Sequence, residues 1–284
     1  MRHMNRSIGK GRVMRLSVKA CLTAMGLMAV LATATVHADS LLSVAPLRVL
    51  LSDGKTSEVL SLLNRSEQVR TYKVKMQDQV MGEDGNLKGV DDFAYSAKRM
   101  LRFMPRQVTL QPGQRQTVRV MATPPEGLED GEYHTHLVFD EVLKDTTEEV
   151  RAAAKSGAGL KVQMETTYSV GLPLIYQHGK VTGTLAPKAA KLVTLPNGKT
   201  VFDVTLARTG NGEGTGVVDV VAAGKEGESL VPKRQMHMYR EVDQVTLRMP
   251  LRDGLDVSVQ ALQGMKLQAR VQEEGQPALT VGVE

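Results

Sequence analysis

Apolar side chains occupy eight of the nine even-numbered positions along one unusually long run of the sequence, residues 160–176 (LKVQMETTYSVGLPLIY), and Thr166 is the exception. The intervening positions are mostly polar or small, and alternation with a period of two is typical of a β-strand with one apolar face. Strands usually last about five to six residues, so this run is roughly three times longer than an ordinary sheet requires. The extra length therefore needs an explanation other than the packing of a single sheet.

Six shorter alternating runs precede the long one, and turn-forming sequences such as SDGK, NRSE and EDGN separate them. The six runs cover residues 43–51, 57–64, 70–80, 106–111, 115–122 and 133–142. Seven strands at this spacing, with almost no helical periodicity, predict an antiparallel sandwich of immunoglobulin type. Residues 144–159 differ, because helix-favouring residues are followed by small ones, and we expect a mobile loop there.

Further alternating runs follow a boundary at residues 177–183 and predict a second all-β unit. These runs cover residues 200–209, 214–224, 235–251, 255–262 and 265–274. We therefore expect two β-sandwich domains, an N-terminal one over residues 39–178 and a C-terminal one over residues 179–284.

The first 38 residues have the pattern of a secretory signal peptide. They contain six basic residues and no acidic one, then the apolar run CLTAMGLMAVLATATV, and then small residues at Val36 and Ala38. We expect cleavage after Ala38. The apolar run is about 16 residues long, shorter than the roughly 18 that suggest a membrane span, so we expect no stable membrane insertion.

Removal of this segment changes what the charge of the chain implies about partners. The chain has 36 Lys and Arg against 31 Asp and Glu, but six of the bases precede residue 39, which leaves a formal charge of about −1. A basic pI therefore gives no reason to expect a nucleic-acid partner. The single cysteine, Cys21, is also in the removed segment, so the mature chain cannot form disulfides or thiolate metal sites.

The sequence shows no arrangement typical of an active site. His134 and His136 form an H-x-H pair that could ligate a metal, but no third ligand follows at a diagnostic spacing, so we interpret them as ordinary strand histidines. The chain has no G-x-S-x-G motif, and its glycine-rich residues 210–216 lead into a strand, where a phosphate would find no helix N-terminus. We expect no metal, no cofactor and no enzymatic activity.

Several motifs resemble those of the periplasmic pilus-assembly chaperones of the chaperone-usher pathway, and most closely their non-classical, archaic-type branch. In the first domain these are RFMPRQVTLQPGQRQTVRVMA (102–122), GEYHTHLVF (131–139) and VGLPLIYQHG (170–179). In the second domain they are VTLARTGNGEGTGVVDV (204–220) and HMYREVDQVTLRMPL (237–251). The likeness covers most of the mature chain.

The resemblance implies two immunoglobulin-like domains in a boomerang arrangement and a location in the periplasm. It also implies that the long last strand of the first domain is lent to an incomplete pilin subunit until an outer-membrane usher takes that subunit over. An exposed apolar strand normally promotes aggregation, whereas strand addition turns the same property into a binding mode. An empty chaperone could also cover this strand by self-association.

The resemblance assigns candidate subunit-binding residues on the long run and on the first strand. The even-numbered face would offer Val162, Met164, Tyr168, Val170, Leu172 and Leu174. In the family an arginine on the first strand and a lysine on the long strand bind the C-terminal carboxylate of the subunit. Arg48 matches the arginine, but Pro173 stands at the lysine position, and His178 or Lys180 could compensate. Pro173 lacks an N–H and therefore suits an edge strand.

Two other interpretations remain open at this stage. The chain could be a fimbrial structural subunit or a surface adhesin. Such subunits carry a disordered donor segment before a sandwich that lacks its final strand, whereas here strand-like sequence begins within about four residues of the predicted cleavage site. Alternatively, the long run could be one bent strand that is used wholly inside its own domain.

Overall fold

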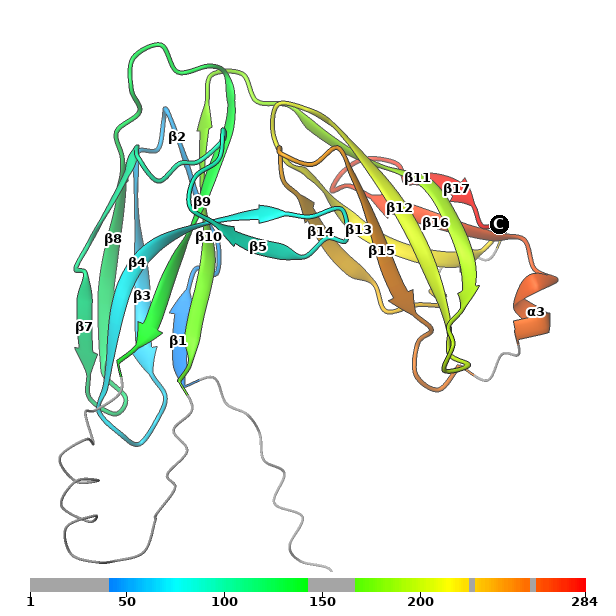
Figure 1. Ribbon diagram of the computed structural model, residues 1–284, viewed down its shortest axis with the longest axis horizontal. Coiled ribbons are helices and arrows are strands. Elements are labelled where there is room, and N and C mark those ends of the chain that lie inside the picture. Colours follow the sequence, from blue (N-terminus) through cyan, green and yellow to red (C-terminus); the bar gives the residue numbers. More distant parts are fainter. Residues whose placement is uncertain (1–40, 143–166, 225–227, 256–258) are drawn as a thin grey trace, which may run out of the picture. The chain divides into compact units, whose positions relative to one another are not determined.

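The computed structural model describes residues 41–142, 167–224, 228–255 and 259–284, which lie in one compact unit, Ser40–Glu284. Their regular secondary structure is almost entirely β-strand, with one short helix (Figure 1). The predicted signal peptide and the predicted mobile loop at 144–159 lie outside the described residues. Within the described ranges, no helix is long and apolar enough to cross a membrane.

The first sandwich consists of two sheets. One has the strand order β1-β3-β8-β6, formed by β1 (Leu42–Ala45), β3 (Ser57–Asn64), β8 (Arg115–Ala122) and β6 (Leu101–Met104). The other has the order β2-β10-β9-β4-β5, with β7 also paired to β4. Its strands are β2 (Val49–Ser52), β10 (Ser169–His178), β9 (Gly131–Glu141), β4 (Arg70–Met81), β5 (Leu87–Val90) and β7 (Gln107–Leu110). All these pairs are antiparallel except β2 with β10, which is parallel.

Alternate side chains of the two sheets form the first core. Leu60 of β3 and Val118 of β8 are fully buried from one sheet, and Leu137 of β9 and Leu174 of β10 are fully buried from the other. Each buried aliphatic side chain of this kind contributes about 1.5–3 kcal/mol relative to an exposed one. The apolar residues that alternate in the sequence are thus the residues that are buried between the two sheets, as expected for a sandwich.

The second sandwich also consists of two sheets with its own buried core. The order β11-β12-β15 joins β11 (Gly183–Thr194), β12 (Thr200–Gly210) and β15 (Gln244–Pro250). The order β14-β13-β16-β17 joins β14 (Arg234–Met238), β13 (Gly214–Ala222), β16 (Leu267–Gln272) and β17 (Leu279–Gly282). The predicted pair of β-sandwiches is therefore confirmed.

Three predicted strands need correction. The run 43–51 is two strands, β1 and β2, which belong to different sheets, because the chain leaves the first ladder at Pro46, a residue without an N–H. The run 235–251 is also two strands, separated by a turn at 239–243. The run 255–262 contains the short helix α3 (Val259–Gln263), whose Ala, Leu and Gln residues favour a helix and which is followed by Gly264.

Candidate functional site

The candidate binding strand β10 is paired along one edge and only partly paired along the other. It pairs with β9 over its whole length, from Ser169 to His178. On the opposite edge β2 pairs only with Leu174–Gln177. In the part of the chain that the structure describes, the stretch from Ser169 to Pro173 has no strand partner on that side.

The direction of the backbone groups follows from one hydrogen bond at the start of this stretch. The N–H of Glu141 in β9 donates to the carbonyl oxygen of Tyr168 (3.1 Å), so the polar groups of Tyr168 face β9. Because the direction alternates along a strand, Ser169, Gly171 and Pro173 direct their backbone groups to the other edge. Pro173 has no N–H to leave unpaired there, which agrees with the predicted edge position.

The even-numbered side chains of β10 form one face that changes from buried to exposed toward its N-terminal end. Leu172 and Leu174 are 1% and 0% exposed in the core of their own sandwich, Val170 packs at the border of this core, and Tyr168 is 52% exposed. The expectation that Leu172 and Leu174 are presented to a partner needs correction, because their own domain encloses them. A subunit-binding role for Tyr168 and Val170 stays a prediction.

Two residues of the predicted face, Val162 and Met164, lie outside the described residues. They continue the same alternation beyond Tyr168. Their part in binding therefore also stays a prediction.

Arg48 directly precedes β2 and pairs with Glu213, which lies between β12 and β13 of the second sandwich. Its Nη2 donates to Oε2 of Glu213, and the two side chains are 25% and 13% exposed. Nδ1 of His237 lies 3.6 Å from the same oxygen, longer than a hydrogen bond. Burial disfavours charge on Glu213, but the adjacent His237 and the charge of Arg48 together hold its pKa below the ordinary value. The predicted anchoring arginine is thus already paired with a carboxylate of its own chain.

A second carboxylate, that of Glu132 in β9, lies in the electric field of the same arginine. Its Oε2 accepts a hydrogen bond from Nε2 of Gln177 (3.1 Å), whereas its Oε1 has no partner among the described residues. Burial raises the pKa of Glu132, and the charge of Glu213 raises it further, while Arg48 acts in the opposite direction. Only Glu213 is paired with Arg48, whereas Glu132 is influenced by its charge alone, so an added anion would compete with Glu213 for the guanidinium.

The predicted H-x-H pair lies buried on β9. Nε2 of His134 is 3.0 Å from Oε2 of Glu241, and its ring stacks on Tyr239 with centroids 4.2 Å apart. Burial, followed by the neighbouring His134, lowers the pKa of His136 to about 4. Across the described ranges, no three His, Cys, Asp or Glu side chains are grouped to hold a metal ion. The histidines instead form contacts between β9 and residues 239–241.

His178, one of the two residues that could compensate for the lysine of the family, is engaged by Asp53. Its Nδ1 lies 2.8 Å from Oδ1 of Asp53, and the hydroxyl of Tyr176 donates to the same oxygen (2.6 Å). These bonds, that of Tyr176 first, together with the N–H of Gly179, lower the pKa of Asp53 to about 2. A role for Lys180 stays a prediction.

Sequence reasoning missed Glu213, Glu132 and Gln177 as parts of this site. Glu213 lies in the glycine-rich stretch 210–216, which reads as a turn and carries no sign of a distant partner. Glu132 carried a weak signal, because it is an acidic residue at the second position of β9, whose first nine residues are all buried. A carboxylate at such a position is rarely left without a charged or hydrogen-bonding neighbour.

Comparison with known proteins gives similarity only at the level of solved structures. No protein-family model and no curated protein matches this chain. A structure of the chaperone-tip adhesin complex of CFA/I fimbriae is similar with a TM-score of 0.47 and 12% identity, over 86% of this chain and 99% of that chain.

Two other similar structures are also fimbrial chaperone complexes. The complex of SafA pilin with the SafB chaperone of Salmonella enterica gives a TM-score of 0.46 and 15% identity, over 85% of this chain and 95% of that chain. The CsuC-CsuE pre-assembly complex from the archaic Csu pili of Acinetobacter baumannii gives 0.45 and 11%, over 86% and 98%. The solved structures that this chain is similar to are thus those of fimbrial chaperones and their complexes, the family that the sequence motifs resemble. At these scores and identities the likeness does not assign a function to this chain.

Proposed function

We propose that this chain is a periplasmic chaperone that binds incomplete fimbrial subunits and delivers them to an outer-membrane usher. The observation that supports it most is the half-paired edge of β10, where Ser169–Pro173 have no strand partner in the described part of the chain. Cleavage of the predicted signal peptide after Ala38 would release the chaperone into the periplasm. In this proposal the subunit completes its own fold with the open edge of β10 and with the residues before it.

Strand addition at this edge would use the backbone groups of Ser169 and Gly171. Both residues are exposed, and both direct an N–H and a C=O away from β9. A subunit strand that accepts and donates here extends the sheet by main-chain hydrogen bonds, which is the general mode of β-strand addition. Unpaired edges of this kind otherwise promote aggregation, so a partner that covers the edge would also protect the chaperone.

The side chains next to this edge would fill the groove of the incomplete subunit. Tyr168 is exposed and Val170 lies at the border of the core, so both have surface to give to a partner. Full burial of an aliphatic side chain contributes about 1.5–3 kcal/mol. Val162 and Met164 would extend the same apolar face, and the thioether of Met164 would adapt to irregular pockets.

Arg48 would bind the C-terminal carboxylate of the subunit. A guanidinium can hold a carboxylate with two parallel hydrogen bonds, which fixes the register as well as adding affinity. Because Arg48 is paired with Glu213 in the free chain, the incoming carboxylate must displace Glu213 or share the guanidinium with it. Binding of the subunit would therefore exchange one ion pair for another.

A proline at position 171 tests strand addition at this edge. The N–H of Gly171 points away from β9, so Gly171→Pro removes a donor that only a partner would use, and its ring obstructs the edge. Gly171→Ala is the matched control, since an added Cβ would meet only Cγ2 of Val138 at 3.8 Å. When a pilin encoded beside this gene is co-expressed, we expect the alanine variant to retain as much subunit as the wild type. The amount of subunit recovered with the proline variant should be at least ten-fold lower.

Equal retention by folded proline and alanine variants would contradict strand donation through this edge. If the proline variant melts at a lower temperature, Tyr168→Asp replaces it as the probe, because this exposed side chain is not part of the core. An aspartate at Leu172 would be a poor probe, since the charge would enter the core of the first sandwich. The alternative, a fimbrial subunit or adhesin, predicts that an antibody against this chain labels surface fibres in electron micrographs, whereas a chaperone should leave them unlabelled.

A further inference from the structure

We propose that a gap in the sheet beside β4, bordered by cationic side chains, binds an extended acidic segment of a partner protein. On one side of β4, β7 pairs with Arg70–Lys73 and β5 pairs with Asp78–Met81. Among the strands that the structure describes, none pairs with Val74–Gln77 on this side. The four residues span about 13 Å at the rise of a strand, but Arg106 already accepts a hydrogen bond from Val74, so the open part of the gap centres on Met76.

The backbone of β4 offers hydrogen-bonding groups inside this gap. The N–H of Val74 donates to the carbonyl oxygen of Arg106 (2.9 Å), which shows that the polar groups of Val74 face this side. Because the direction repeats every second residue, the N–H and C=O of Met76 face the same side. An added strand would find a donor and an acceptor at Met76, between the ends of β7 and β5.

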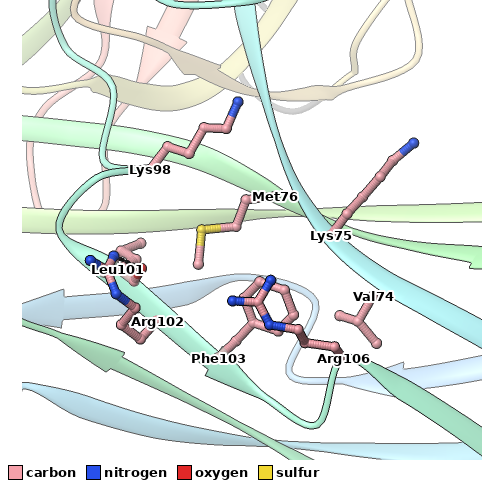
Figure 2. Close-up of a pocket in the computed structure, with 8 residues that line it drawn as sticks. All are labelled: Val74, Lys75, Met76, Lys98, Leu101, Arg102, Phe103 and Arg106. Carbon is pink, nitrogen blue, oxygen red and sulfur yellow. Dashed lines mark hydrogen bonds between the residues drawn. The ribbon is translucent and has the colours of Figure 1, made fainter.

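A cavity of about 340 Å³ opens at the same place (Figure 2). Its lining combines apolar side chains with basic ones: Val74, Met76, Leu101 and Phe103, with Lys75, Lys98, Arg102 and Arg106. Figure 2 shows the Met76 thioether between Lys98 and Phe103, with the guanidinium of Arg106 across the Phe103 ring. The guanidinium carbon lies 5.6 Å from the centroid of this ring, so the ring holds the charge beside the cavity.

The basic side chains of the cavity are not neutralised equally. Nζ of Lys75 is paired with Oδ2 of Asp140 at 2.6 Å. Arg102 donates to two backbone carbonyl oxygens, those of Arg99 and Leu101, which carry no formal charge.

Lys98 and Arg106 have no acidic partner within the described ranges. Both are exposed. The cavity continues toward β5, where Asp91 is the one carboxylate in its lining. The cations around the gap therefore exceed the nearby acids, and the surface would attract a negatively charged partner.

These features together select one kind of partner. Main-chain groups at Met76 favour a polypeptide in an extended conformation over a small anion, which could not complete the ladder. A segment that carries both acidic and apolar residues would match this lining, with carboxylates for Lys98 and Arg106 and apolar side chains for Met76 and Phe103. The gap lies on the side of β4 away from β9, whereas the open edge of β10 lies on the other side of β9. The two sites are separate, and both could be occupied at once.

A fluorescently labelled peptide with the sequence Glu-Val-Glu-Phe-Glu-Val, blocked at both ends, is a suitable probe of the mature protein. We expect saturable binding measured by fluorescence anisotropy, and a loss of at least ten-fold in affinity for the double variant Lys98→Glu, Arg106→Glu. The matched control is Lys199→Glu, which makes a charge change of the same kind at an exposed turn between β11 and β12. This control should bind like the wild type apart from the small effect of net charge.

A second peptide separates strand addition from simple charge attraction. It has the same sequence, with N-methyl groups on alternate residues that block main-chain hydrogen bonds, and we expect it to bind at least ten-fold more weakly. Equal binding of both peptides would show that a small or unstructured anion suffices and would overturn the proposal. Absence of binding to the wild type, or equal weakening by Lys199→Glu, would also overturn it. None of these outcomes depends on subunit capture by β10, so each proposal can fail without the other.

Discussion

Replacing Glu213 by glutamine should have opposite effects on stability and on subunit binding. In the free chain Arg48 and Glu213 form an ion pair, and their side chains are 25% and 13% exposed, respectively. A hydrogen bond between charged groups of this kind contributes about 1.5–3 kcal/mol. Glu213→Gln should therefore lower the free energy of unfolding by about 1–3 kcal/mol, measured by urea denaturation.

The same substitution should strengthen the hold on a subunit. If the C-terminal carboxylate of the subunit must displace Glu213, removal of that competitor makes the free energy of binding more favourable by about the same amount as the loss in stability. Each 1.4 kcal/mol is a factor of ten, so the affinity should rise about 10- to 100-fold. The assay is transfer of a bound subunit to a second, tagged copy of the wild-type protein, and this transfer should become slower by a comparable factor.

Two controls make this prediction specific to Arg48 and to a carboxylate. Glu228→Gln removes one partner of the exposed ion pair with Arg252. This substitution should leave the rate of transfer unchanged and should change the free energy of unfolding by no more than about 1 kcal/mol. A subunit extended by two residues moves its carboxylate, and the effect of Glu213→Gln should then disappear. Unchanged or faster transfer from the Glu213→Gln variant would refute competition for Arg48, whatever its stability.

Three further predictions concern the two sandwiches. Leu172→Ala should lower the free energy of unfolding by about 2–5 kcal/mol in denaturant titrations, because the side chain is 1% exposed in the core, and a change below 1 kcal/mol would contradict this placement. The pKa of His136 is lowered from 6.5 to about 4, so stability should be complete above pH 6.5 and decline by about 3 kcal/mol as the pH falls to 4. His136→Gln should remove this part of the pH dependence, and identical slopes for both proteins would contradict it. Arg208→Lys should cost about 2–4 kcal/mol in thermal unfolding, since Arg208 donates five hydrogen bonds that one ammonium cannot replace, and an unchanged melting temperature would show that they contribute little.

The sequence predicts the individual strands best where alternation and turn chemistry coincide. The runs 57–64 and 115–122 match β3 and β8 residue by residue, because each is bounded by turn-forming residues and buries alternate residues over its second half. The run 235–251 has neither glycine nor proline at its break. The turn at 239–243 is instead held by hydrogen bonds from Arg208, a residue of another strand that local reasoning does not connect with it.

The site is less accessible to sequence reasoning because its contacts join distant parts of the chain. The parallel pairing of β2 with β10 places Arg48 beside the candidate strand, but no pattern in either run indicates this register. The pair of Arg48 with Glu213 spans 165 positions. Alternation correctly predicts one apolar face on β10, yet it cannot show where the core ends, so Leu172 and Val170 look alike in the sequence although only the first is fully buried.

Amide hydrogen exchange along β10, measured by NMR on the free protein and on its complex with a fimbrial subunit, tests the central claim most directly. The N–H groups of Val170 and Leu172 face β9 and should exchange slowly in both states. Those of Ser169 and Gly171 should exchange rapidly in the free protein and become at least 100-fold slower in the complex. If the exchange of Ser169 and Gly171 is the same in both states while the subunit is bound, the open edge of β10 is not where the subunit binds.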